Sequence, residues 1–155
     1  MEEVKYIPGD LVMTDGAPIG TKKGVVYQVT ASDPNRTLTL KDGTVNKGVV
    51  TLDAVTEEDK AYFAETSTWV KHIVPIPLTK EILELNGYKS QGFERNENDD
   101  NFFEFFSKRN RLYIRYYSYL AIYPSIKTTE LIKVKYLHEF QHLLFGLGLN
   151  LELKV

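Results

Sequence analysis

The first half of the chain alternates short runs of hydrophobic and β-branched residues with turn residues. The clearest turn is Asp42-Gly43, which lies between two such runs and is typical of a β-hairpin. Glycine suits this position because it adopts a positive φ at little cost. The spacing of the runs predicts a small SH3-like β-barrel. Its strands are expected at residues 11–13, 25–30, 37–40, 49–52 and 69–75.

A short helix and two prolines mark the end of this half. Thr56 is suited to cap a helix over residues 57–64, since acidic residues fill the first turn after it. Pro75 and Pro77 cannot lie inside a sheet ladder or a helix interior. We therefore expect two domains, an SH3-like small barrel over residues 1–77 and a second unit over residues 78–155.

The second half combines helical and strand patterns. Thr79 is a predicted N-cap, Leu78 and Leu83 are spaced as a hydrophobic staple, and Gly87 is placed to end the helix. The expected fold class is α+β, in which the barrel is followed by an α-β-β-β-α unit with an antiparallel sheet. The strands are expected at residues 88–95, 102–107 and 111–123, the last helix at 135–147, and a further terminal strand at 149–153.

One strand of this sheet is predicted to have two different faces. Alternate positions give one apolar face, made of Leu112, Ile114, Tyr116, Leu120 and Ile122. The opposite face interleaves arginine with tyrosine, at Arg111, Tyr113, Arg115, Tyr117, Tyr119 and Tyr123. Arginine and tyrosine are enriched at protein interfaces, and together they also bind single-stranded nucleic acid. Because tyrosines pair across strands in any antiparallel sheet, simple packing is a third interpretation.

The last predicted helix contains the string His138-Glu139-Phe140-Gln141-His142, which matches the HExxH pattern of zinc metalloproteases. There the two histidines bind zinc and the glutamate acts as general base. The apolar residues of this helix cluster on one face, so His138 and His142 are expected on the solvent side. A catalytic zinc also needs a third protein ligand, for which the chain offers Glu152 or, from the first half, His72. The zinc hydrolase is therefore only an alternative.

Composition narrows the remaining classes of protein to which the chain could belong. The chain has 155 residues, no cysteine and a formal net charge of −2. The absence of cysteine excludes disulfides and thiolate zinc sites and fits a reducing compartment. No apolar stretch reaches the roughly 18–20 residues of a transmembrane helix, and the N-terminus has no signal-peptide pattern. The slight negative charge argues against a general nucleic-acid coat protein.

Two stretches resemble an uncharacterised family of small proteins from phages and mobile elements of gut anaerobes. Residues 76–83 (IPLTKEIL) with Asn86-Gly87-Tyr88 resemble its middle region, and residues 136–145 (YLHEFQHLLF) resemble its C-terminal helix. The opening Gly9-Asp10-Leu11-Val12 is similar to its first segment. The family has no established activity. Its helix usually carries glutamine and asparagine at the positions of Glu139 and His142, which implies that the HExxH string is incidental.

The leading functional hypothesis is a non-enzymatic phage or mobile-element accessory protein that acts as a protein-binding module. Its expected binding residues are on the Tyr/Arg face, at Arg111, Tyr113, Arg115, Tyr117 and Tyr119. The expected partner is a host or virion protein, nucleic acid is the alternative partner, and no membrane or cofactor is expected. We expect the protein in the host cytoplasm or in the virion. The sequence leaves its oligomeric state open.

Overall fold

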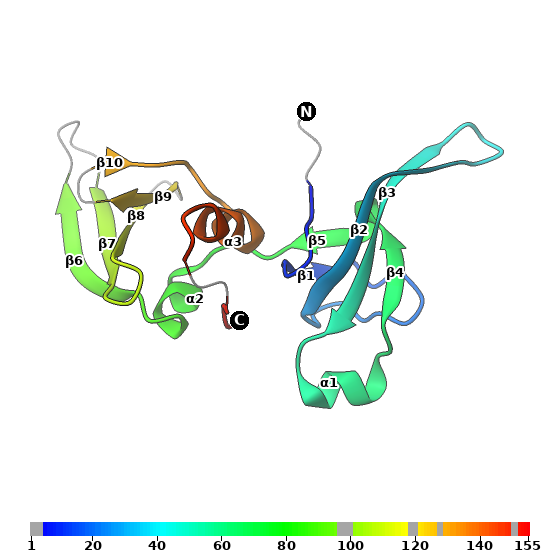
Figure 1. The fold of residues 1–155 in the computed structure, drawn as a ribbon, viewed down its shortest axis with the longest axis horizontal. Helices are drawn as coiled ribbons and strands as arrows, with labels where there is room; N and C mark the ends of the chain where they lie inside the picture. Colours follow the sequence, from blue (N-terminus) through cyan, green and yellow to red (C-terminus); the bar gives the residue numbers. More distant parts are fainter. Residues whose placement is uncertain (1–4, 96–100, 118–120, 127–128, 150–151) are drawn as a thin grey trace. The chain divides into compact units, whose positions relative to one another are not determined.

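The computed structural model describes residues 5–95, 101–117, 121–126, 129–149 and 152–155. The chain divides into two compact units, Met1–Ile76 and Pro77–Val155, and each unit is described separately. Each contains one five-stranded antiparallel sheet, and three α-helices occur in the described part of the chain. The class is therefore α+β with most of the regular structure in strands (Figure 1).

The first unit is a single sheet with the strand order β4-β3-β2-β1-β5. Its strands are β1 (Leu11–Thr14), β2 (Tyr27–Thr39), β3 (Val45–Ala54), β4 (Thr66–Trp69) and β5 (Ile73–Pro75). A six-residue helix, α1 (Glu57–Tyr62), lies between β3 and β4, and a 3₁₀ turn, η1 (Val70–His72), joins β4 to β5. Thr56 caps α1, as expected, because its hydroxyl accepts a hydrogen bond from the Asp59 amide.

Two strand predictions for this unit are wrong. Residues 25–30 and 37–40 were expected as separate strands, but β2 is continuous and pairs with β3 on both sides of Pro34. The register shifts between Asp33 and Thr37, so the turn residues form an irregularity within the strand instead of ending it. The expected strand 69–75 is broken by η1 and contributes to two opposite edges of the sheet.

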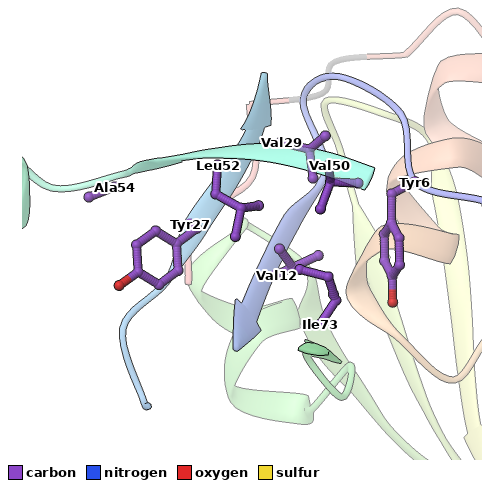
Figure 2. Packing of buried hydrophobic residues seen from close by; sticks show 8 residues of the cluster. All are labelled: Tyr6, Val12, Tyr27, Val29, Val50, Leu52, Ala54 and Ile73. Atoms are coloured by element: carbon purple, nitrogen blue, oxygen red, sulfur yellow. The ribbon is translucent and has the colours of Figure 1, made fainter. Parts of the chain in front are cut away.

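The core of the first unit lies on one side of these strands. Val50, Leu52 and Ala54 alternate along β3 and are buried, as the period of two in a strand requires. Figure 2 shows the side chains of this cluster gathered between the strands. The members of the cluster are Tyr6, Val12, Tyr27, Val29, Val50, Leu52, Ala54 and Ile73.

The second unit is an antiparallel sheet with the order β10-β9-β8-β7-β6 and two helices. The elements are α2 (Lys80–Leu85), β6 (Lys89–Arg95), β7 (Asn101–Ser107), β8 (Leu112–Tyr117), β9 (Ile122–Ile126), β10 (Thr129–Glu130) and α3 (Leu137–Gly146). The predicted strand 111–123 is wrong, because β8 and β9 are separate and pair antiparallel. The expected α-β-β-β-α order therefore contains five strands. Of the expected terminal strand, residues 149, 152 and 153 are not in strand conformation, and 150–151 lie outside the described residues.

Helix α2 begins and ends as its sequence predicts. The Thr79 hydroxyl accepts a hydrogen bond from the Ile82 amide, 3.2 Å away, and Leu78 and Leu83 are both buried. Gly87 follows the helix with φ +84°, and the Tyr88 amide donates to the Leu83 carbonyl, so the last turn is closed. The buried Leu83 is the residue through which this short helix contributes to the core of the unit.

We expect the free energy of unfolding to depend on Leu83 far more than on Leu85 of the same helix. Leu83 is 1% exposed and Leu85 is 52% exposed. Leu83→Ala should cost about 2–5 kcal/mol, because it leaves a cavity, whereas Leu85→Ala should change stability by less than about 0.5 kcal/mol. Urea titration followed by circular dichroism measures both. Losses of equal size would contradict the burial of Leu83.

Candidate functional site

The predicted Tyr/Arg face exists in part on the sheet of the second unit. Strand pairing puts Tyr113 opposite Phe106, Arg115 opposite Glu104 and Tyr117 opposite Phe102, all on one face of β7 and β8. Tyr123 of β9 joins this face as the partner of Arg115. Two further predicted residues do not extend it: Arg111 lies in the turn before β8, with φ 50°, and Tyr119 lies outside the described residues.

Two of the predicted binding residues are engaged inside the unit. Tyr117 is 2% exposed and packs with Phe102 and Ala121. Its hydroxyl donates a hydrogen bond to the carboxylate of Glu130. The same carboxylate accepts from Arg115, whose Nη1 is 3.2 Å from Oε1. Arg115 and Tyr117 therefore tie the short edge strand β10 to the sheet.

The accessible remainder of this face is aromatic and acidic. The rings of Phe106 and Tyr113 are half-buried and pack with centroids 4.5 Å apart. Burial raises the pKa of the Glu104 carboxyl, the charge of Glu94 raises it further, and Arg115 lowers it. Carboxylates therefore share this face with the Arg115 guanidinium, and the nucleic-acid alternative stays a prediction.

The HExxH string is part of the helix packing. His138 is 3% exposed, so its expected position on the solvent side is wrong. The buried strip of α3 is Leu137, His138, Phe140, Gln141 and Leu144. This strip follows the helical spacing from Leu137, and it includes His138 because that residue lies one turn before Gln141. The rings of His138 and His142 have centroids 5.7 Å apart in an edge-to-face arrangement.

The glutamate of the string has a structural role. Glu139 Oε1 accepts hydrogen bonds from the amides of Lys135 and Tyr136, at 3.0 and 2.8 Å, and so caps the start of α3. A carboxylate held in this way is not poised as a general base. Among the described residues, no group of three histidine, cysteine, aspartate or glutamate side chains is arranged to hold a metal ion. His72, considered above as a third ligand, is hydrogen-bonded to Asp15 in the first unit.

A pocket of about 550 Å³ lies on the first unit, where sequence reasoning had placed no site. This volume is typical of sites that bind ligands or partner side chains. The pocket is built from the loop between β1 and β2, from β2, β3 and β4, and from η1. Its lining residues are Pro18, Ile19, Arg36, Val49, Thr66, Ser67, Thr68, Trp69 and His72.

Hydrogen bonds fix the loop that forms one wall of this pocket. The Lys22 amide donates to the hydroxyl of Tyr27, whose ring is in the core. Within the loop, the Thr21 hydroxyl donates to the Pro18 carbonyl at 2.8 Å. At the loop start, the Asp15 amide donates to the His72 carbonyl at 3.0 Å. The wall is therefore attached both to the core and to η1, and the pocket is preformed.

The apolar part of the pocket combines an exposed aliphatic side chain with an indole. Ile19 is 96% exposed, and Trp69 is half-buried on β4. Trp69 is the cross-strand partner of Val49, so these two side chains share one face of the sheet. Isolated exposed hydrophobic residues are common on protein surfaces. Here the exposed Ile19 borders a concave site together with the half-buried Val49 and Trp69, which is typical of a binding surface.

The polar part of the pocket is basic or neutral. Arg36 and His72 line it together with three hydroxyl-bearing residues, and the lining includes no carboxylate. Asp15 Oδ2 is 2.9 Å from His72 Nδ1, and this contact is the main cause of the lowered pKa of the Asp15 carboxyl. Since the ionised carboxylate only accepts hydrogen bonds, His72 Nδ1 carries the proton and Nε2 is the nitrogen left for a ligand.

The raised pKa of Glu104 gives the second unit a defined pH dependence. The folded state binds this proton more tightly than the unfolded chain, so stability falls as the pH rises through the raised pKa. Glu104→Gln should therefore increase the free energy of unfolding near neutral pH, and the gain should vanish in acid. NMR titration of the carboxyl carbon checks the cause, because Glu94→Gln should lower the pKa of Glu104. An unchanged pKa would contradict the contact between the two charges.

Known proteins supply no comparison for this site. No family model, curated protein or solved structure matches the chain. Within the described residues, no helix has both the length and the hydropathy needed to cross a membrane.

Proposed function

We propose that the protein is a non-enzymatic protein-binding module that holds a segment of a partner protein in the pocket of its first unit. The observation that carries this proposal is the preformed pocket in which the fully exposed Ile19 lies with Trp69 and Val49. Aromatic and aliphatic side chains that border a concave site are typical anchors for a partner's side chains. The proposal keeps the function expected from the sequence and transfers it to another surface.

The hydrogen bonds around the pocket support binding over catalysis. Each hydroxyl of the lining is already used within the unit: Thr66 donates to the Ile19 carbonyl, Ser67 bonds the Thr51 hydroxyl, and Thr68 donates to the Trp69 carbonyl. In the described part of the chain none of these hydroxyls is bonded to His72. A nucleophile would need such a contact to the histidine for activation.

For the first unit we keep the SH3-like barrel as a proposal, because its described strands form a sheet with β4 and β5 at its two edges, and no closed barrel is found. The strand order β4-β3-β2-β1-β5 and the 3₁₀ turn between β4 and β5 support the proposal. The resemblance of residues 136–145 to phage and mobile-element proteins supports an accessory role, with a host or virion protein as the partner. The Tyr/Arg face is the weaker candidate interface, because Arg115 and Tyr117 are committed to Glu130.

A display library of random peptides, selected against the whole protein, tests this proposal. Synthetic copies of the enriched peptides should bind the wild type, and Ile19→Ser should weaken that binding roughly tenfold or more, because an anchor of this kind contributes about 1.4 kcal/mol or more. Tyr62→Ser is the matched control, since Tyr62 is 79% exposed on α1 and does not line the pocket. Its affinity should equal that of the wild type.

Two results would contradict the pocket as the binding site. In the first, the selection enriches no peptide above a scaffold control. In the second, the enriched peptides bind Ile19→Ser as tightly as the wild type. Circular dichroism of each variant excludes unfolding as the cause of a loss.

A further inference from the structure

One cationic side chain of the pocket lining has no polar partner in the described part of the chain. Arg36 is exposed on β2, and among the described residues its guanidinium has no hydrogen bond or ion pair. Two lysines of the same unit differ in this respect, because Lys71 donates to the Asn46 side chain at 2.8 Å and Lys60 pairs with Glu57 at 3.6 Å. The guanidinium of Arg36 therefore retains its donor capacity for a ligand.

Arg36 lines the pocket from an irregularity in the β2 backbone. The residue lies where the register of β2 shifts against β3, between Asp33 and Thr37. Such irregularities re-aim the side chains of a strand. Gly48 of β3 lies opposite with φ +83°, where an added Cβ would be 3.0 Å from Val70 and 3.8 Å from the Pro34 carbonyl. The tight approach at Gly48 is therefore to Val70 of η1, and the β2 backbone is at ordinary contact distance.

The ligand that fits these groups carries one carboxylate and one apolar side chain. A guanidinium pairs with a carboxylate through two parallel hydrogen bonds. His72 Nε2, left over by the contact with Asp15, is the ring nitrogen that can form a hydrogen bond to the backbone of an extended segment. Ile19, Trp69 and Val49 supply the apolar surface beside these polar groups. Phosphorylated segments usually need several cations, and the pocket has one arginine.

We propose that the pocket of the first unit recognises an acidic peptide segment, with Arg36 paired to its carboxylate and an adjacent apolar side chain held against Ile19 and Trp69. This inference rests on the proposed function and adds the chemistry of the partner. Arg36 determines which segments bind, and the apolar wall supplies the general affinity.

The peptides enriched in the display selection provide the first part of the test. An aspartate, a glutamate or a free C-terminus should recur next to an apolar residue. Synthetic copies with an amidated C-terminus separate the two sources of the carboxylate. Loss of binding on amidation assigns the terminal carboxylate, and retained binding assigns the side chain.

A double-mutant cycle provides the second part. Arg36→Gln should weaken the binding of an acidic peptide roughly tenfold, as expected for a lost hydrogen bond to a charged group. In the matched amide peptide, Asn or Gln replaces the acidic residue. The variant and the wild type should bind this peptide with equal affinity. Lys41→Gln removes a positive charge from the same hairpin outside the pocket, and it should leave both affinities unchanged.

The outcomes separate this inference from the proposed function. If Ile19→Ser abolishes binding but Arg36→Gln has no effect on any enriched peptide, the carboxylate inference is wrong and the binding pocket stands. If neither variant changes the affinity, both the carboxylate inference and the assignment of the pocket as the binding site are wrong. Enrichment only of phosphorylated peptides, from a library that contains them, would also overturn the carboxylate inference.

Discussion

Antiparallel pairing of β2 with β3 connects the stability of the first unit to its pocket. The ladder runs from Tyr27 opposite Ala54 to Thr39 opposite Val45. One face of β3 buries Val50 and Leu52 in the core, while Val49 on the other face lines the pocket. A register slip of one residue would exchange the two faces. The buried positions therefore hold the pocket residues in place, although the pocket residues add little to the core.

In the second unit, the charge of Arg115 is paired within its own sheet. A half-buried arginine is costly unless a carboxylate and hydrogen bonds compensate its charge. Glu130 on β10 supplies that carboxylate to Arg115 and also accepts from Tyr117. Because both groups already bond Glu130, a partner would have to displace that contact to use the same atoms, whereas the buried Arg115 Nε has no hydrogen-bond partner among the described residues. A similar argument applies to Glu139, whose carboxylate completes the start of α3.

Local signals in the sequence predicted caps and turns correctly. Predictions of strand ends and of burial failed where these depend on contacts with segments distant in the sequence. The caps at Thr56 and Thr79, the turn at Gly43 and the α+β class follow from neighbouring residues, and the structure contains them. The sequence around Pro34 predicts the end of a strand. Whether the strand ends there depends on whether β3 continues to pair beside it, which the neighbouring residues do not determine. The burial of His138 could not be read from the helix alone, since the apolar residues around it favoured the opposite face. The pocket left no pattern, because its lining comes from five separate segments.

Arg36 illustrates how a binding residue differs from a structural one. In both units, the described arginine or lysine side chains that stabilise the fold do so through visible partners, such as Glu130 for Arg115 and Asn46 for Lys71. Arg36 lines a pocket whose other described lining residues include no carboxylate, at an irregularity of β2. A solvated arginine elsewhere on the surface would carry no such implication. The strand irregularity, the apolar wall and the unpaired guanidinium are together the basis on which we propose a preference for acidic segments.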